Sequence, residues 1–154
     1  MATLPTDDTD PGILYDTTCM SVRNCLAVGN SATGHTSSTL VLSWDGSTWT
    51  ASPSILSHAG DPSLTAIGCS NETNCLVAGT SLASYQRIAA RLDGSTWREV
   101  SIPSDFETIH AIACEGPSQC LVVGSANVND FGNTTTLIAS LSAGNWTSEQ
   151  GPTP

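Results

Sequence analysis

The six cysteines of this chain form three pairs with identical spacing, and this regularity constrains the fold more than any other feature. Each pair has the form Cys-x5-Cys, and similar residues follow each pair. The pairs are Cys19 with Cys25, Cys69 with Cys75, and Cys114 with Cys120. Similarity at a nearly fixed period indicates a repeat architecture, so the chain reads as three copies of one unit.

Each copy contains four short apolar segments separated by turn residues. One segment ends at the first cysteine, and the next starts at the second cysteine in the pattern Cys-x-x-x-Gly. A third segment leads to a tryptophan near which the fourth begins, in Leu40–Trp49, Ile88–Trp97 and Leu137–Trp146. No stretch has a helical period, so the sequence predicts an all-β fold of three four-stranded antiparallel units.

The turns divide each unit into a uniform end and a variable end. Asp45-Gly46 and Asp93-Gly94 predict type I′ hairpin turns, and Ala143-Gly144 predicts a weaker turn. The other connections share little sequence, and in an up-and-down sheet they meet at the opposite end. These variable connections are residues 30–38, 80–86, 125–133, 53–63 and 103–108.

Ligand binding is expected at the variable end, because function is usually carried by diverse loops on a rigid scaffold. The candidate ligand-binding residues there are His35, His58, Asp61, Tyr85, Asp105, Glu107, Asp130 and Phe131. Paired carboxylates could cleave a glycoside, but these do not recur between copies, so no catalytic residue is predicted. The three histidines occupy unrelated repeat positions, and no metal site or cofactor is expected.

Disulfides are the favoured interpretation of the cysteines, with a metal site or free thiols as alternatives. Each pair brackets a hairpin loop, which brings its two Cα atoms within disulfide reach. Disulfides imply an oxidising compartment, so an extracellular or cell-surface location is expected. The chain as given shows no signal peptide, so we expect that a leader has been removed and that Met1 is an added start.

Composition excludes several classes of partner. The chain has four arginines, no lysine and a net charge of −10. Nucleic acids and anionic membranes require basic clusters, so neither is expected as a partner, and no apolar run is long enough to insert into a membrane. The four tryptophans, Trp44, Trp49, Trp97 and Trp146, are expected to pack inside or between units.

The pattern Cys-x5-Cys-x3-Gly followed by Trp-Asp-Gly-x-x-Trp resembles the repeat of secreted actinobacterial-type β-propeller proteins. The hairpin Asp45-Gly-Ser-Thr-Trp49 is also distantly similar to Asp-box (BNR-like) and kelch-like blades, although it is one residue shorter than the Asp-box motif. The resemblance covers residues 13–150 or so and implies a β-propeller fold. It implies almost nothing about activity, since related propellers include lectins, hydrolases and assembly factors.

The resemblance implies a propeller, but three units are too few to close one. The expected segments are an acidic arm (1–12), blade 1 (13–53), blade 2 (54–103), blade 3 (104–150) and a tail (151–154). Closed propellers have about four to eight blades. A homo-oligomer of two chains would supply six, and the same head-to-tail contact would give a filament if it failed to close. A β-trefoil, which closes as a monomer, is the alternative.

These observations lead to a ranked set of functions. The first is a secreted, non-enzymatic binding module, with glycan as the ligand to test. The alternative is a self-assembling structural or surface protein that forms a ring or filament. A propeller-type hydrolase has the least support.

Overall fold

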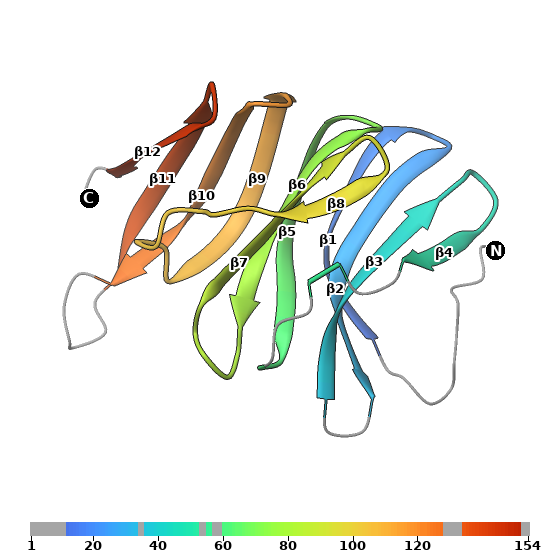
Figure 1. The fold of residues 1–154 in the computed structure, drawn as a ribbon, viewed down its shortest axis with the longest axis horizontal. Helices are drawn as coiled ribbons and strands as arrows, with labels where there is room; N and C mark the ends of the chain where they lie inside the picture. The colour runs from blue at the N-terminus through green and yellow to red at the C-terminus, as the bar shows by residue number, and fades with distance from the viewer. Residues whose placement is uncertain (1–11, 34–35, 53–54, 57–59, 128–133, 152–154) are drawn as a thin grey trace.

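The computed structural model describes residues 12–33, 36–52, 55–56, 60–127 and 134–151, and this part of the chain is all β. The strands are β1 (Gly12–Ser21), β2 (Asn24–Thr33), β3 (Thr36–Trp44), β4 (Trp49–Ser52), β5 (Pro62–Asn71), β6 (Asn74–Ser81), β7 (Arg87–Asp93), β8 (Thr96–Glu99), β9 (Thr108–Gly116), β10 (Gln119–Asn127), β11 (Thr134–Ser142) and β12 (Asn145–Gln150). They form three four-stranded antiparallel sheets, β1–β4, β5–β8 and β9–β12, called sheets 1, 2 and 3 below (Figure 1). The prediction of three such units is confirmed.

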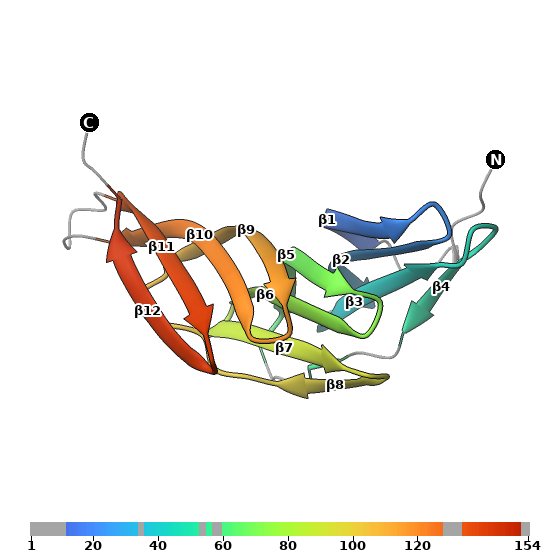
Figure 2. The same cartoon turned by 90° about the horizontal axis from the view of Figure 1, so that it is seen from above.

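The three sheets stand face to face and fan out from their first strands (Figure 2). Strand β5 lies between β1 and β9 and contacts both. Two hydrogen bonds join these inner strands: the Ile67 amide donates to Asp16 Oδ2 (2.9 Å), and Thr65 Oγ1 donates to the Ile109 carbonyl (3.0 Å). The last strands, β4, β8 and β12, lie at the outer side of the arc.

Each sheet has two faces that are defined by its second strand. Alternation along a strand places Cys25, Cys75 and Cys120 on one face of their sheets, called the cysteine face. The next residue in each copy defines the opposite face, called the leucine face. These residues are Leu26, Leu76 and Leu121.

Both contacts between sheets pair a leucine face with a cysteine face. In the first interface, Leu26, Val28 and Val41 of sheet 1 pack on a cluster from sheet 2 that includes Ile67 and Val77. The second interface repeats this arrangement one sheet further along the arc. It packs Leu76, Ala78 and Ala89 of sheet 2 on Ile109, Ile112, Val122 and Ala139 of sheet 3. Sheet 2 is therefore buried on both faces, and β6 has no exposed residue.

A β-bulge at the same position in each first strand explains the repeated glycine. The register skips one residue, namely Tyr15 in β1, Thr65 in β5 and His110 in β9. The bulge brings the first strand against the glycine of the second strand, namely Gly29, Gly79 and Gly124. A Cβ at Gly79 would overlap the Ser63 carbonyl oxygen and lie 2.8 Å from Leu64 Cα. Only glycine fits this position, because both obstructing atoms belong to the backbone.

We expect Gly79→Ala to lower the free energy of unfolding by about 3 kcal/mol or more, because backbone must move in the most buried sheet. Urea denaturation measures this change. Gly116→Ala is the matched control: its Cβ would meet the flexible end of Gln119 at 3.3 Å, and we expect a change within about 0.5 kcal/mol. Equal effects of the two substitutions would contradict this explanation of the repeat.

All six cysteines form disulfides within their own hairpins, as predicted. The bonds are Cys19–Cys25, Cys69–Cys75 and Cys114–Cys120, and the paired Cα atoms lie 4.0, 4.0 and 4.1 Å apart. In every case the two cysteines are directly opposite each other in the antiparallel ladder. Three disulfides indicate an oxidising environment.

The first variable connection is shorter than predicted, because most of residues 30–38 belong to strands. Asn30 pairs with Thr39, and Ser31 pairs with Ser38. The hydroxyls of Ser31 and Ser38 lie 2.9 Å apart, and Asn30 Nδ2 donates to Ser37 Oγ at 3.3 Å. Cross-strand hydrogen bonds replace apolar packing here, so a polar sequence that reads as a loop extends the hairpin.

The turn predictions are wrong for both Asp-Gly pairs. A type I′ turn needs positive φ at both central residues, but Asp45 and Asp93 do not have it. Ala143 (φ 51°) and Gly144 (φ 84°) do have it, so the pair predicted to be the weaker turn has the type I′ signature. In sheet 1, Asp45 instead caps a longer turn, because its Oδ1 accepts the amides of Ser47 and Thr48, both at 2.8 Å.

These hydrogen bonds, led by the Thr48 amide and then the Ser47 amide, hold the pKa of Asp45 well below its usual value of 3.8. Because the pKa of Asp45 is lower in the folded than in the unfolded state, ionised Asp45 stabilises the turn at pH values above the unfolded-state pKa. This stabilisation is lost as the pH falls through the folded-state pKa. We therefore expect Asp45→Ala to lower the Tm at pH 7, and the difference to shrink in acid below pH 3.8. Asp93→Ala, at the equivalent position of sheet 2, is the control. A difference that persists unchanged in strong acid would contradict this assignment.

Candidate functional site

The strand ends that border the variable connections lie at one end of the sheets, opposite the disulfide hairpins (Figure 1). The structure describes four of the eight candidate ligand-binding residues: Asp61, Tyr85, Asp105 and Glu107. The other four lie outside the described residues. They are His35, His58, Asp130 and Phe131.

Asp61 joins sheet 1 to sheet 2. Its Oδ1 accepts a hydrogen bond from the Ser37 amide (3.1 Å), and its carbonyl accepts one from the Leu82 amide (3.0 Å). Its backbone has a positive φ of 52°, which aspartate tolerates better than most residues. The carboxylate is therefore already engaged in holding the junction between the sheets.

Tyr85 is the most exposed aromatic residue of the described chain, with 75% of its surface accessible. It lies in the turn between β6 and β7 with a positive φ of 54°. Its amide donates to the Ser81 carbonyl (2.8 Å), and its own carbonyl accepts from Arg87 Nη1 (2.9 Å). An exposed ring on a fixed backbone can offer a flat apolar surface to a ligand.

One equivalent residue in the third strand of each sheet holds the chain that leaves the fourth strand. Arg87 Nε donates to the Phe106 carbonyl. At the equivalent positions, Thr39 Oγ1 accepts from the Ile55 amide (3.2 Å), and the Thr136 carbonyl accepts from the Gly151 amide (2.9 Å). The sequence interpretation missed Arg87, although an arginine where the other copies have threonine was a detectable signal.

We expect Arg87→Ala to lower the free energy of unfolding by about 1.5–3 kcal/mol, because it removes charged donors from two carbonyls. Chemical denaturation measures this loss. The exposed Arg98 on β8 is the matched control, and its replacement by alanine should cost little. If both variants unfold alike, the contact with Phe106 does not stabilise the fold.

Asp105 borders a polar hollow of about 390 Å³ at the variable end of sheet 3. Ser148 Oγ donates to Asp105 Oδ2 at 3.1 Å. The other lining residues come from β10, β11 and β12. They are Ala126, Asn127, Leu137, Glu149 and Gln150. The hollow therefore combines two carboxylates, two amides and a hydroxyl.

The sequence interpretation found only Asp105 of these polar groups. Ser148, Glu149 and Gln150 belong to β12 and lie outside the variable connections, whereas Asn127 falls within the connection 125–133 but was not among the predicted residues. Glu107 was selected with Asp105 but does not line this hollow. Its Oε2 is buried without a hydrogen bond, and its amide donates to the Ser125 carbonyl (2.7 Å).

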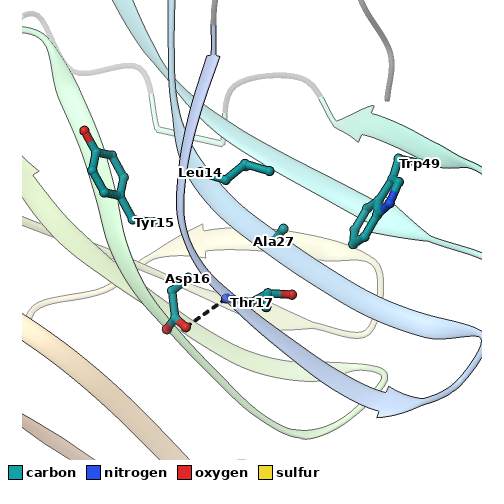
Figure 3. Close-up of a pocket in the computed structure, with 6 residues that line it drawn as sticks. All are labelled: Leu14, Tyr15, Asp16, Thr17, Ala27 and Trp49. Carbon is teal, nitrogen blue, oxygen red and sulfur yellow. Dashed lines mark hydrogen bonds between the residues drawn. The ribbon is translucent and has the colours of Figure 1, made fainter. Parts of the chain in front are cut away.

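A second hollow, of about 380 Å³, lies along β1 on the first sheet. Two of its lining residues, Tyr15 and Asp16, leave β1 on the other side. The remaining lining residues lie on the cysteine face of sheet 1 and are Leu14, Thr17, Ala27 and Trp49 (Figure 3). Its exposed lining is mostly apolar, which sets it apart from the hollow at Asp105. No sequence pattern singled out this surface as a site.

The four tryptophans fall into two environments. Trp97 packs on the first interface and Trp146 on the second, where its Nε1 donates to the Ser101 carbonyl (3.1 Å). Trp44 and Trp49 lie on the cysteine face of sheet 1 with ring centroids 5.4 Å apart. Trp44 Nε1 donates to the Val22 carbonyl at 3.2 Å.

Within the described ranges, no three His, Cys, Asp or Glu side chains are close enough to hold a metal ion. The same part of the chain has no helix long and apolar enough to cross a membrane. Comparison of the sequence with protein-family models and with curated proteins gives no match.

Proposed function

We propose that this chain is an extracellular, non-enzymatic binding module that binds neutral carbohydrate in the polar hollow at Asp105. The composition of the hollow carries the proposal: residues with carboxylate, amide and hydroxyl side chains line about 390 Å³. Sugar hydroxyls both donate and accept hydrogen bonds, and this set of side chains offers both functions. Two carboxylates, in a chain of net charge −10, disfavour anionic ligands.

The scaffold of this module is proposed to be part of a β-propeller. Three observations support it: each sheet is a four-stranded meander, the sheets fan out from their first strands, and they stack face to face. Every strand pairing between the described residues stays within one copy. This favours the propeller over a β-trefoil, which joins its copies by strand pairing. The three disulfides support secretion.

The carbohydrate proposal is tested by calorimetric titration with neutral oligosaccharides. We expect the double variant Asn127→Ala, Gln150→Ala to bind at least about tenfold more weakly, since each amide contributes hydrogen bonds to the ligand. Gln119→Ala is the matched control, because this exposed amide lies at the disulfide end. The absence of binding at millimolar sugar would refute the carbohydrate assignment. Turnover of a glycoside that Asp105→Asn abolishes would refute the non-enzymatic role.

A self-assembling surface protein is the second candidate. The specific observation that favours it is that, among the residues the structure describes, the arc of sheets ends in two faces without a neighbouring sheet (Figure 2). Both roles involve sheet 3, because Ser148 and Glu149 line the polar hollow and also a smaller hollow on the open face of this sheet.

A further inference from the structure

The arc of sheets ends in two faces of opposite kind. Sheet 1 turns its leucine face toward sheet 2, so its cysteine face is open. Sheet 3 turns its cysteine face toward sheet 2, so its leucine face is open. Exposed apolar residues occur on both, including Leu14 on the first (40% exposed) and Leu121 on the second (45% exposed).

The open leucine face has the same residue positions as the two that are already covered. The first interface contains three buried residues of sheet 1, namely Leu26, Val28 and Val41. By strand pairing, the equivalent positions of sheet 3 hold Leu121, Val123 and Ile138. Leu76, Ala78 and Ala89 occupy these positions in sheet 2. The covered residues are at most 9% exposed. The open leucine face of sheet 3 therefore has apolar side chains at the positions that are buried in both interfaces within the chain.

The open cysteine face is also equivalent to surfaces that are covered elsewhere in the molecule. Leu14 and Ala27 of sheet 1 correspond to Leu64 and Val77 of sheet 2, both fully buried. Trp49 corresponds to Trp97, which packs on the first interface. The apolar hollow of Figure 3 thus lies on the surface that, in sheets 2 and 3, is covered by the leucine face of the preceding sheet.

The open faces differ from the covered ones in one informative respect. Thr17 on the open cysteine face takes the position that Ile67 and Ile112 hold in the two interfaces. On the open leucine face, a smaller hollow of about 150 Å³ is lined by Leu121, Ile138, three hydroxyl side chains and the carboxylate of Glu149. Apolar residues mixed with polar ones are typical of surfaces that meet as folded partners.

We propose that the leucine face of sheet 3 docks on the cysteine face of sheet 1 of a second copy of this chain. The contact repeats the packing already seen twice within the chain, so it needs no new surface. Two copies that dock in both directions supply six sheets, the only multiple of three between about four and eight blades. The ring is a two-fold dimer with two identical contacts. This proposal rests on the packing of the faces and not on carbohydrate binding, although Ser148 and Glu149 line both the polar hollow and the hollow on the leucine face.

The mass of the native protein in solution tests the proposal. Light scattering should give twice 15.9 kDa for the wild type. Leu121→Asp and Leu14→Asp each place a carboxylate in both contacts, and each should weaken self-association by about 30-fold or more. Val22→Asp is the matched control, since Val22 is 88% exposed at a disulfide hairpin and belongs to neither face. Thermal unfolding establishes that each variant folds.

A mixing experiment tests the head-to-tail direction. Leu121→Asp retains an intact cysteine face, and Leu14→Asp retains an intact leucine face, so a mixture can form one good contact that neither variant forms alone. Recovery of a two-chain species only on mixing supports the proposal. A monomeric wild type at high concentration would overturn it, as would a Leu121→Asp variant that remains dimeric. Polymers that lengthen with concentration would overturn the closed ring.

Discussion

The packing of a leucine face on the cysteine face of the next sheet is the interaction on which the rest of the structure depends. No strand pairing between described residues crosses from one sheet to another, so side-chain packing and a few hydrogen bonds alone set the angle of the arc. The up-and-down order of the strands places the strand ends that border the variable connections at one end. Contacts such as Asp61 with Ser37, and Arg87 with Phe106, then fix these connections across successive sheets.

The inner and outer strands of the arc have different tasks. The first strands lie side by side and are joined by the Asp16 and Thr65 hydrogen bonds, and their bulges make the repeated glycine necessary. The outer strands lie apart from one another (Figure 2), and the polar hollow at Asp105 is lined by sheet 3 and the connection before it. The contacts among the inner strands thus hold the sheet on which the proposed ligand hollow lies.

Sequence reasoning recovered the features that depend on local spacing and missed those that depend on packing. Cys-x5-Cys fixed the hairpins and their disulfides because both partners lie in one short loop. The bulges at Tyr15, Thr65 and His110 leave no local signal except the glycine they oppose. The polar hollow combines residues from the connection before β9 with residues from the ends of β10 and β12, and only the folded sheet brings these together.

The local nature of the disulfides has a consequence for biosynthesis. Six cysteines can pair in 15 ways, yet each native bond joins residues only six positions apart in sequence. Short loops close more readily than long ones, so the correct partner is also the nearest one for every cysteine. Each copy can therefore oxidise as soon as its own hairpin has formed, without waiting for the others. In a chain with more copies, every cysteine would still have its correct partner six positions away. Correct disulfide formation would therefore not become harder as copies are added.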